Sequence, residues 1–144
     1  MINSSLFSSK TEEWSTPQDF FNLIDKEFKF TLDAAATVEN AKCKNFYTIE
    51  DNGLEQKWTG VVWCNPPYGR KIYKWIEKAK DSSNDGATVV MLLPARTDTQ
   101  WFHNLIYKKE EIRFIKGRLK FGDGKGSAPF PSMLVIFRPK HFES

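Results

Sequence analysis

Blocks with helical and strand-like spacing of hydrophobic residues alternate along the chain. The first block, residues 15–28, has apolar residues three and four positions apart, as expected for a helix with one buried face. These residues are Phe20, Leu23, Ile24 and Phe28. We expect Thr16 to be the N-cap, Pro17 the first helical residue, and Asp19 to occupy a place like that of a capping box.

Three later segments favour helices. Residues 71–80 and 99–109 each have one apolar side, and residues 34–43 can start a helix. The apolar side of the first comprises Ile72, Trp75, Ile76 and Ala79, and that of the second comprises Trp101, Phe102, Leu105 and Ile106.

Strands are predicted between these helices. They are residues 28–32, 46–49, 61–64, 87–94, 111–115 and 132–137, with a turn at 51–53. The alternation predicts an α/β fold with a mostly parallel, twisted sheet and helices on both faces. No helix separates the last two strands, so we expect an antiparallel strand at the C-terminal end.

The composition of the chain fits one folded domain. Of its 144 residues 40% are hydrophobic and 15% aromatic. No apolar stretch approaches the roughly 20 residues of a membrane span, so we expect a cytoplasmic protein with no membrane partner. Cys43 and Cys64 have no zinc-type spacing, which predicts reduced thiols, Cys64 in the core, and no metal site.

Charge is distributed unevenly between the two parts of the chain. Residues 1–60 contain 6 basic and 10 acidic residues, whereas residues 61–144 contain 15 basic and 8 acidic residues. A basic C-terminal part suggests a polyanionic partner. Lysines scattered for solubility are the alternative.

Three segments are expected to converge on one side of the sheet. Ligands of such sheets bind outside the carboxyl ends of the strands. Asp33, residues 65–68 and residues 94–98 each follow a predicted strand. We therefore expect these residues to form one rim.

The sequence Asn65-Pro66-Pro67-Tyr68 is suited to binding an amino group. Prolines fix φ and lack an N–H, so this loop is stiff and presents carbonyl groups. The Asn65 side-chain oxygen and the Pro66 carbonyl can accept both hydrogens of an exocyclic amino group, which directs the nitrogen lone pair toward an electrophile. Tyr68 offers a ring on which a base can stack.

Asn65-Pro66-Pro67-Tyr68 after an apolar strand resembles the catalytic motif of amino-group methyltransferases that use S-adenosylmethionine. Further matching segments, in the same order along the chain, are Trp14 to Pro17 and residues 32–36, 51–60, 92–103, 117–121 and 128–137. Residues 12–138 are thereby similar to the small phage-type DNA N6-adenine methyltransferases. The resemblance implies a Rossmann-like class I methyltransferase domain at 14–144 after a flexible tail at 1–13.

The resemblance also implies an activity and its cofactor. A methyl group would pass from S-adenosylmethionine to the N6 amino group of an adenine flipped out of double-stranded DNA, in the cytoplasm of a bacterial host cell. Asn65 and Pro66 would hold the amino group, Pro67 would shape the loop, and Tyr68 would stack on the base.

Cofactor contacts are expected from the first rim segment and the residues before the first helix. The residues implied are Trp14, Thr16, Pro17, Asp33, Ala34, Asp51 and Asn65. Residues 34–36 are alanines where the family pattern has glycines, so the cofactor loop is expected to differ. The alternative role of Asp33 is a helix N-cap.

DNA contacts are expected from basic residues in or beside loops near the rim. These candidates are Arg96, Lys108, Lys109, Arg113, Arg118, Lys120 and Lys125. Residues 121–131 would either touch phosphates or simply connect two strands. Arg96 could instead form a surface salt bridge, with Thr97 or Asp98 capping the helix that follows.

Other functions stay open at this point. Related motifs occur in enzymes that modify glutamine in proteins or guanine in RNA, and the domain could be a non-catalytic nucleic-acid-binding module. The sequence leaves the DNA recognition site and the oligomeric state undetermined.

Overall fold

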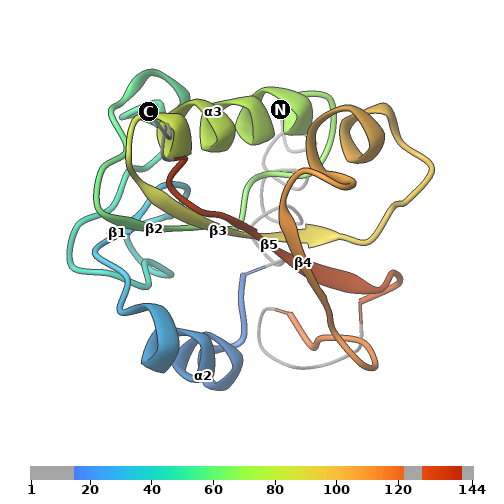
Figure 1. The fold of residues 1–144 in the computed structure, drawn as a ribbon. Coiled ribbons are helices and arrows are strands. Elements are labelled where there is room, and N and C mark those ends of the chain that lie inside the picture. The colour runs from blue at the N-terminus through green and yellow to red at the C-terminus, as the bar shows by residue number, and fades with distance from the viewer. Residues whose placement is uncertain (1–14, 122–127, 141–144) are drawn as a thin grey trace, which may run out of the picture.

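The fold consists of a five-stranded sheet between two helical layers (Figure 1). The computed structural model describes residues 15–121 and 128–140, so the predicted tail at 1–13 lies outside the described residues. The strands are β1 (Leu32–Asp33), β2 (Val61–Cys64), β3 (Thr88–Pro94), β4 (Glu111–Phe114) and β5 (Ser132–Phe137). The helices are α2 (Gln18–Phe28), η1 (Gly53–Glu55), α3 (Ile72–Asn84) and η2 (Phe102–Ile106).

The strands are arranged in the order β1-β2-β3-β5-β4. The β1–β2 and β2–β3 pairs are parallel, whereas β5 is antiparallel to both β3 and β4. Of the five described strands, β5 alone runs against the others. This confirms a mostly parallel sheet with an antiparallel C-terminal strand.

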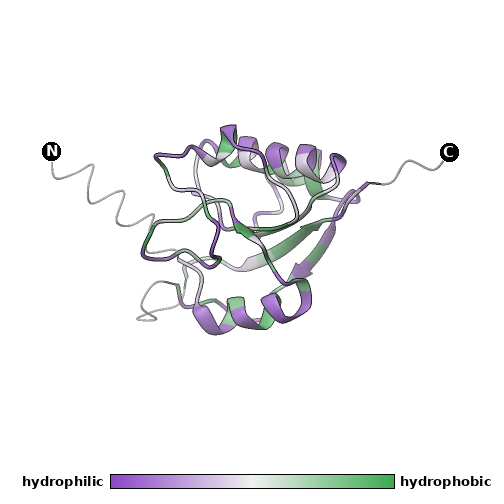
Figure 2. Ribbon diagram, turned by 90° about the vertical axis from the view of Figure 1, so that its left-hand side faces the viewer, coloured by the Kyte–Doolittle hydropathy of each residue, from purple (hydrophilic) through white to green (hydrophobic). Residues whose placement is uncertain are grey.

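Both faces of the sheet are covered. Figure 1 shows α3 and η2 on one face and α2 on the other. Alternate residues of β3 divide between two core clusters, because neighbouring side chains of a strand point to opposite faces. Val89, Met91 and Leu93 pack toward α3, and Val90 and Leu92 toward α2. In Figure 2 the strands are largely hydrophobic, while α2 and α3 alternate hydrophobic and polar residues.

Helix α2 begins two residues later than Thr16. Pro17 is the N-cap, Gln18 is the first helical residue, and no side chain caps the helix. The prediction of Thr16 as N-cap is therefore wrong by one position. The cause is that the Thr16 hydroxyl is bonded to Asn65 instead of to the helix.

Residues 34–43 do not form the predicted helix. They form turns, held by the Asp33 carboxylate, which accepts hydrogen bonds from the backbone N–H groups of Ala35 (3.2 Å) and Lys42 (3.0 Å). The predicted strands on either side are also reduced. β1 contains only two residues, and the segment 46–49 contributes a single bridge between Phe46 and Asp33.

The helix after β3 is shorter than predicted. Its last part, η2, is a five-residue π-helical turn in which the Tyr107 N–H donates to the Phe102 carbonyl at 2.8 Å. Neither Thr97 nor Asp98 caps it. The Thr99 hydroxyl accepts a hydrogen bond from the Phe102 N–H at 3.2 Å instead.

The two cysteines are free. Cys64 is fully buried in the core cluster that also contains the buried face of α3, which confirms its predicted place in the core. Burial raises the pKa of the Cys43 thiol to about 12. Among residues 15–121 and 128–140, no helix is long and apolar enough to cross a membrane.

Candidate active site

A cavity of about 460 Å³ opens at the carboxyl ends of β1 and β2. The cavity is lined by six predicted site residues that lie at this rim. Thr16, from the segment before α2, lines it as well. The six are Asp33, Ala34, Asn65, Pro66, Pro67 and Tyr68. Pro17 and Asp51 are not among the lining residues, and Trp14 lies outside the described part of the chain.

Asn65 lies between two hydroxyl groups. Its side-chain Nδ2 donates a hydrogen bond to Thr16 Oγ1 at 3.1 Å, and the Tyr68 hydroxyl donates to Asn65 Oδ1 at 3.4 Å. The second contact is longer than usual for an O–H···O bond. The amide of Asn65 is thus oriented with its NH₂ group toward Thr16 and its oxygen toward Tyr68.

Tyr68 belongs to a small aromatic group at the rim. Its ring lies 5.6 Å from that of Phe130 at an angle of 71°, and burial raises the pKa of the Tyr68 hydroxyl above its usual value. The Arg96 guanidinium lies 5.9 Å from the Phe130 ring. Sequence reasoning missed Phe130, although an aromatic residue between Pro129 and Pro131 in a rim loop was a usable signal.

Asp33 is the buried carboxyl group of the cavity. It is 3% exposed, and burial raises its pKa to about 6, against the opposing effect of the N–H groups of Lys42 and Ala35. The expected alternative of a helix N-cap does not apply, because no helix follows Asp33. Its carboxylate instead shapes the turns that form one wall of the cavity.

The backbone of residues 34–36 is already engaged within the protein. The N–H groups of Ala34 and Ala36 donate to the carbonyls of Trp63 and Tyr47, each at 2.9 Å, while that of Ala35 donates to Asp33. The amides of Ala34 and Ala36 therefore join the end of β1 to neighbouring segments, while that of Ala35 closes the turn on Asp33.

Gly53 is needed where the turn 51–53 meets β1. A Cβ at this position would collide with the Ala34 carbonyl oxygen and touch the Trp75 ring. The Asp51 carboxylate accepts hydrogen bonds from the Thr48 N–H at 2.8 Å and its hydroxyl at 3.2 Å. Asp51 therefore holds the turn, and its neighbours Asn52 and Gly53 line the cavity.

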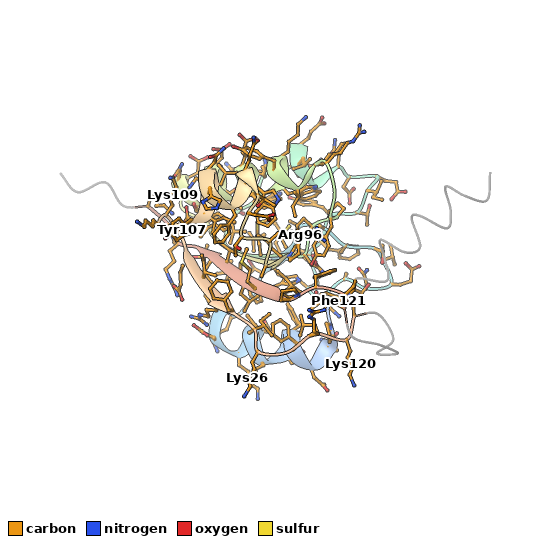
Figure 3. The ribbon with its side chains drawn as sticks, turned by 90° about the vertical axis from the view of Figure 1, so that its right-hand side faces the viewer. Lys26, Arg96, Tyr107, Lys109, Lys120 and Phe121 are labelled. Atoms are coloured by element: carbon orange, nitrogen blue, oxygen red, sulfur yellow. The ribbon has the colours of Figure 1, made fainter. Side chains whose placement is uncertain are left out.

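The structure separates the predicted DNA-binding residues into two groups. Arg96 and Lys120 lie on the rim side, and Arg118 donates a hydrogen bond to the Ala128 carbonyl at 3.3 Å, two residues before Phe130. Lys109, directly preceded by Lys108, lies toward the opposite end of the strands (Figure 3). The reason is the direction of β4. Glu111, at the start of β4, pairs with Ile136 of β5, and Ile136 pairs with Val90 near the start of β3. The residues just before β4 therefore lie at the end of the sheet where β3 begins, opposite the rim. The expected position of Lys108 and Lys109 near the rim is wrong, and Lys125 lies outside the described residues.

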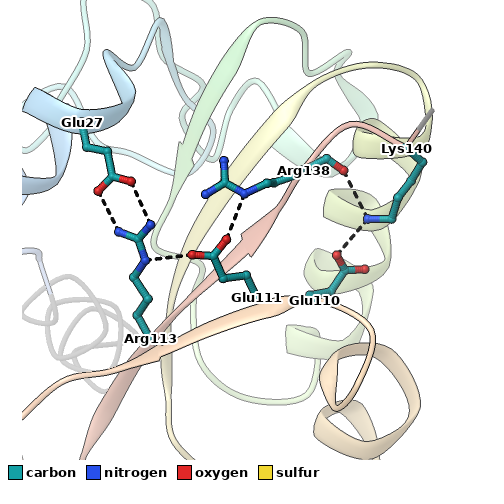
Figure 4. Close-up of polar contacts among 6 residues, drawn as sticks. All are labelled: Glu27, Glu110, Glu111, Arg113, Arg138 and Lys140. Carbon is teal, nitrogen blue, oxygen red and sulfur yellow. Dashed lines mark hydrogen bonds and ion pairs between the residues drawn. The ribbon is translucent and has the colours of Figure 1, made fainter.

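Several C-terminal cations are paired with glutamates along the β4 side (Figure 4). Arg113 binds Glu27 through two hydrogen bonds of 2.7 and 2.8 Å and also contacts Glu111. The expected placement of Arg113 near the rim is wrong as well, since it joins β4 to α2. Arg138 pairs with Glu111, and Lys80 and Lys140 with Glu110. Much of the excess positive charge is thus locally balanced.

Sequence reasoning overlooked a second basic group directly after Tyr68. Arg70, Lys71 and Lys74 are exposed, and within residues 15–121 and 128–140 their side chains have no acidic partner. Lys71 also lines the cavity.

In the described residues, no group of three His, Cys, Asp or Glu side chains is placed to hold a metal ion.

Comparison with known proteins decides between the functions left open by the motif. The family model described as DNA N-6-adenine-methyltransferase (Dam) matches residues 3–143. The chain belongs to this family. As a DNA adenine methyltransferase it has the expected α/β fold, with the Asn65-Pro66-Pro67-Tyr68 segment at the rim.

Two phage proteins are similar to this methyltransferase. The DNA N-6-adenine-methyltransferase of Haemophilus phage HP1 is 35% identical over 149 residues, covering 97% of this chain and 86% of the relative. That of Escherichia phage T1 is 37% identical over 109 residues, covering 74% of this chain and 45% of the relative. A putative methyltransferase of Escherichia coli, YfdM, is 38% identical over 65 residues, or 40% of this chain and 71% of the relative.

Proposed function

We propose that this methyltransferase transfers a methyl group from S-adenosylmethionine to N6 of an adenine rotated out of double-stranded DNA. The proposal rests on one observation. The Asn65 side chain, the Pro66 loop and the Tyr68 ring line the same cavity as the buried Asp33. An acceptor site and a site for a charged cofactor are thereby adjacent. With DNA as acceptor, the enzyme would act in the cytoplasm of a bacterial host.

The cavity suits S-adenosylmethionine in size and in chemistry. Its volume of about 460 Å³ lies in the range of small-molecule sites. Asp33 supplies a carboxyl group, Thr37 and Asn40 supply polar groups, and Ile49 and Leu54 supply apolar surface. When bound, the cofactor provides an electrophilic methyl group. These side chains would hold it beside Asn65.

The residues of the acceptor site would prepare the adenine amino group. The Asn65 oxygen and the Pro66 carbonyl would accept its two hydrogens, which draws the nitrogen lone pair out of conjugation with the ring. Pro66 is buried and followed by Pro67, so the loop cannot easily adjust. The expected contribution is positioning, which is a large part of catalysis for an already activated methyl donor.

Tyr68 and Phe130 would hold the flipped base. Their rings meet at 71°, so a base stacked on one ring would have its edge toward the other. Stacking of a base on an aromatic ring contributes roughly 1–3 kcal/mol, comparable with the few kcal/mol needed to open a base pair.

The DNA backbone would follow the basic residues of the rim. Arg70, Lys71 and Lys74 follow Tyr68 closely in the sequence, and the Arg96 guanidinium lies 5.9 Å from the Phe130 ring. Cations without acidic partners can bind phosphates without first breaking an ion pair. We therefore propose these residues, together with Arg118 and Lys120, as phosphate contacts.

The test is transfer of labelled methyl from S-adenosylmethionine to unmethylated duplex DNA, followed by mass spectrometry of the nucleosides. We expect N6-methyladenine. Asn65→Ala should abolish transfer with cofactor affinity largely retained. Thr31→Val, which removes a hydroxyl just before β1 that bonds to Val61, should retain the rate. Label in RNA or protein but not in DNA, or full activity of Asn65→Ala, would contradict the proposal.

A further inference from the structure

The segment before α2 joins the two halves of the cavity. Ser15 and Thr16 both line it, and each hydroxyl accepts a hydrogen bond from an asparagine on a different wall. Asn40 Nδ2 donates to Ser15 Oγ at 2.9 Å, and Asn65 Nδ2 donates to Thr16 Oγ1 at 3.1 Å. The two consecutive hydroxyls thus connect the turns after β1 with the acceptor loop after β2.

The Asn40 end of this connection is well anchored. Asn40 Oδ1 accepts a hydrogen bond from the Thr37 N–H at 2.7 Å, and Thr37 Oγ1 accepts one from the Asn40 N–H at 3.1 Å. This reciprocal pair fixes the side chain that holds Ser15. Thr16 is only 5% exposed, so water has little access to this residue.

We infer that Thr16 is a positioning residue whose buried hydroxyl orients the Asn65 amide for the methyl acceptor. This inference rests on the proposed role of Asn65. A side-chain amide has a donor end and an acceptor end, and only the acceptor end can bind the hydrogens of an amino group. In the structure Thr16 Oγ1 accepts a hydrogen bond from the Asn65 NH₂ group, and Oδ1 faces the Tyr68 hydroxyl. Of these two contacts the one to Thr16 is the shorter, 3.1 Å against 3.4 Å.

The variants Thr16→Val and Thr16→Ser separate this role from packing. Valine keeps the branched shape of threonine without the hydroxyl, whereas serine keeps the hydroxyl. We expect Thr16→Val to lower kcat at saturating cofactor by about 10- to 100-fold, the effect of a small displacement of a reacting group. Thr16→Ser should restore most of the rate. Thr31→Val is the matched control, because its hydroxyl bonds to Val61 outside the cavity.

Two kinetic outcomes would overturn the inference. One is an unchanged kcat in Thr16→Val. The other is a loss confined to the KM for S-adenosylmethionine, since that would make Thr16 a cofactor contact only. Thermal unfolding of each variant checks that the comparison is made between folded proteins.

A second readout does not depend on methyl transfer. In ¹⁵N-labelled protein, the side-chain NH₂ signals of Asn65 are assigned by their absence in Asn65→Asp. Thr16→Val should shift these signals and speed their exchange with water, while Thr16→Ser and Thr31→Val should not. Unmoved signals in Thr16→Val would overturn the inference. Absence of transfer to DNA by the wild-type enzyme would instead reject the proposed function, and the NMR result would still decide whether Thr16 orients Asn65.

Discussion

Tyr68 and Phe130 lie edge to face at the rim, with ring centroids 5.6 Å apart, although 62 positions separate them in the sequence. Tyr68 follows β2 and Phe130 precedes β5. These strands are separated by β3 in the sheet. The pair therefore exists only because the carboxyl end of β2 and the start of β5 lie at the same edge.

Phe130→Ala should weaken productive DNA binding. Loss of one base-contacting ring is expected to lower kcat/KM for DNA, by an amount that corresponds to roughly 1–3 kcal/mol of lost transition-state stabilisation. Phe130→Leu tests whether the ring matters beyond packing, because leucine keeps apolar contact with Phe121. Steady-state kinetics with Tm as a control gives the answer. Equal kcat/KM for Phe130→Leu and the wild type would exclude a stacking role.

The basic residues after Tyr68 should contribute more to DNA binding than Lys108 and Lys109 do. Arg70→Gln with Lys74→Gln should lower the slope of log affinity against log salt by about 1.8, since each phosphate contact contributes about 0.9. Lys108→Gln with Lys109→Gln is the matched control of equal charge change at the opposite edge, and should leave the slope unchanged. The slopes are measured by fluorescence anisotropy with duplex DNA. The reverse ranking would place the DNA on the other edge.

Asp33 should make the protein less stable as the pH rises from about 4 to about 6. Its pKa is raised by burial from 3.8 to about 6, so the folded state binds a proton that the unfolded state has already released. The free energy of unfolding should fall by on the order of 3 kcal/mol over this range, since each pKa unit corresponds to about 1.36 kcal/mol. Urea unfolding at several pH values measures it.

Asp33→Asn provides the reference for that measurement. Glu27 and Glu111 have pKa values lowered mainly by hydrogen bonds from Arg113 and Arg138, respectively, so they favour the folded state as the pH rises. Their effect is common to both proteins and cancels in the difference. A difference in unfolding free energy between wild type and Asp33→Asn that does not vary with pH would show that Asp33 titrates normally.

Gly53→Ala should destabilise the cavity wall. The added methyl group would meet the Ala34 carbonyl oxygen, which is backbone and held by β1, so η1 must move away. We expect a loss of about 1–3 kcal/mol in unfolding free energy and weaker cofactor binding, because Gly53 and Ala34 both line the cavity. Calorimetry of unfolding and of cofactor binding tests both effects. An unchanged Tm would indicate that the turn has room to shift.

The elements with strong local patterns were predictable. The apolar runs at 61–64 and 87–94 became β2 and β3, and the amphipathic segment 71–80 became α3, because each pattern matches only one way of burying its side chains. The segment 34–43 was not predictable in this way. Its alanines have high helix propensity, but the hydrogen bonds that the backbone N–H groups of this segment donate to Asp33, Tyr47 and Trp63 outweigh that preference.

The sequence by itself determined the α/β alternation and the position of Asn65-Pro66-Pro67-Tyr68 at a strand end, because periodicity and prolines act locally, and the resemblance of its motifs to amino-group methyltransferases indicated the activity. Only the tertiary structure decided which distant groups meet at that strand end. It placed the Thr16 hydroxyl on Asn65 instead of on α2, brought Phe130 to Tyr68, and moved Lys108 and Lys109 to the far edge. These outcomes depend on the order and direction of the strands, which no local pattern specifies.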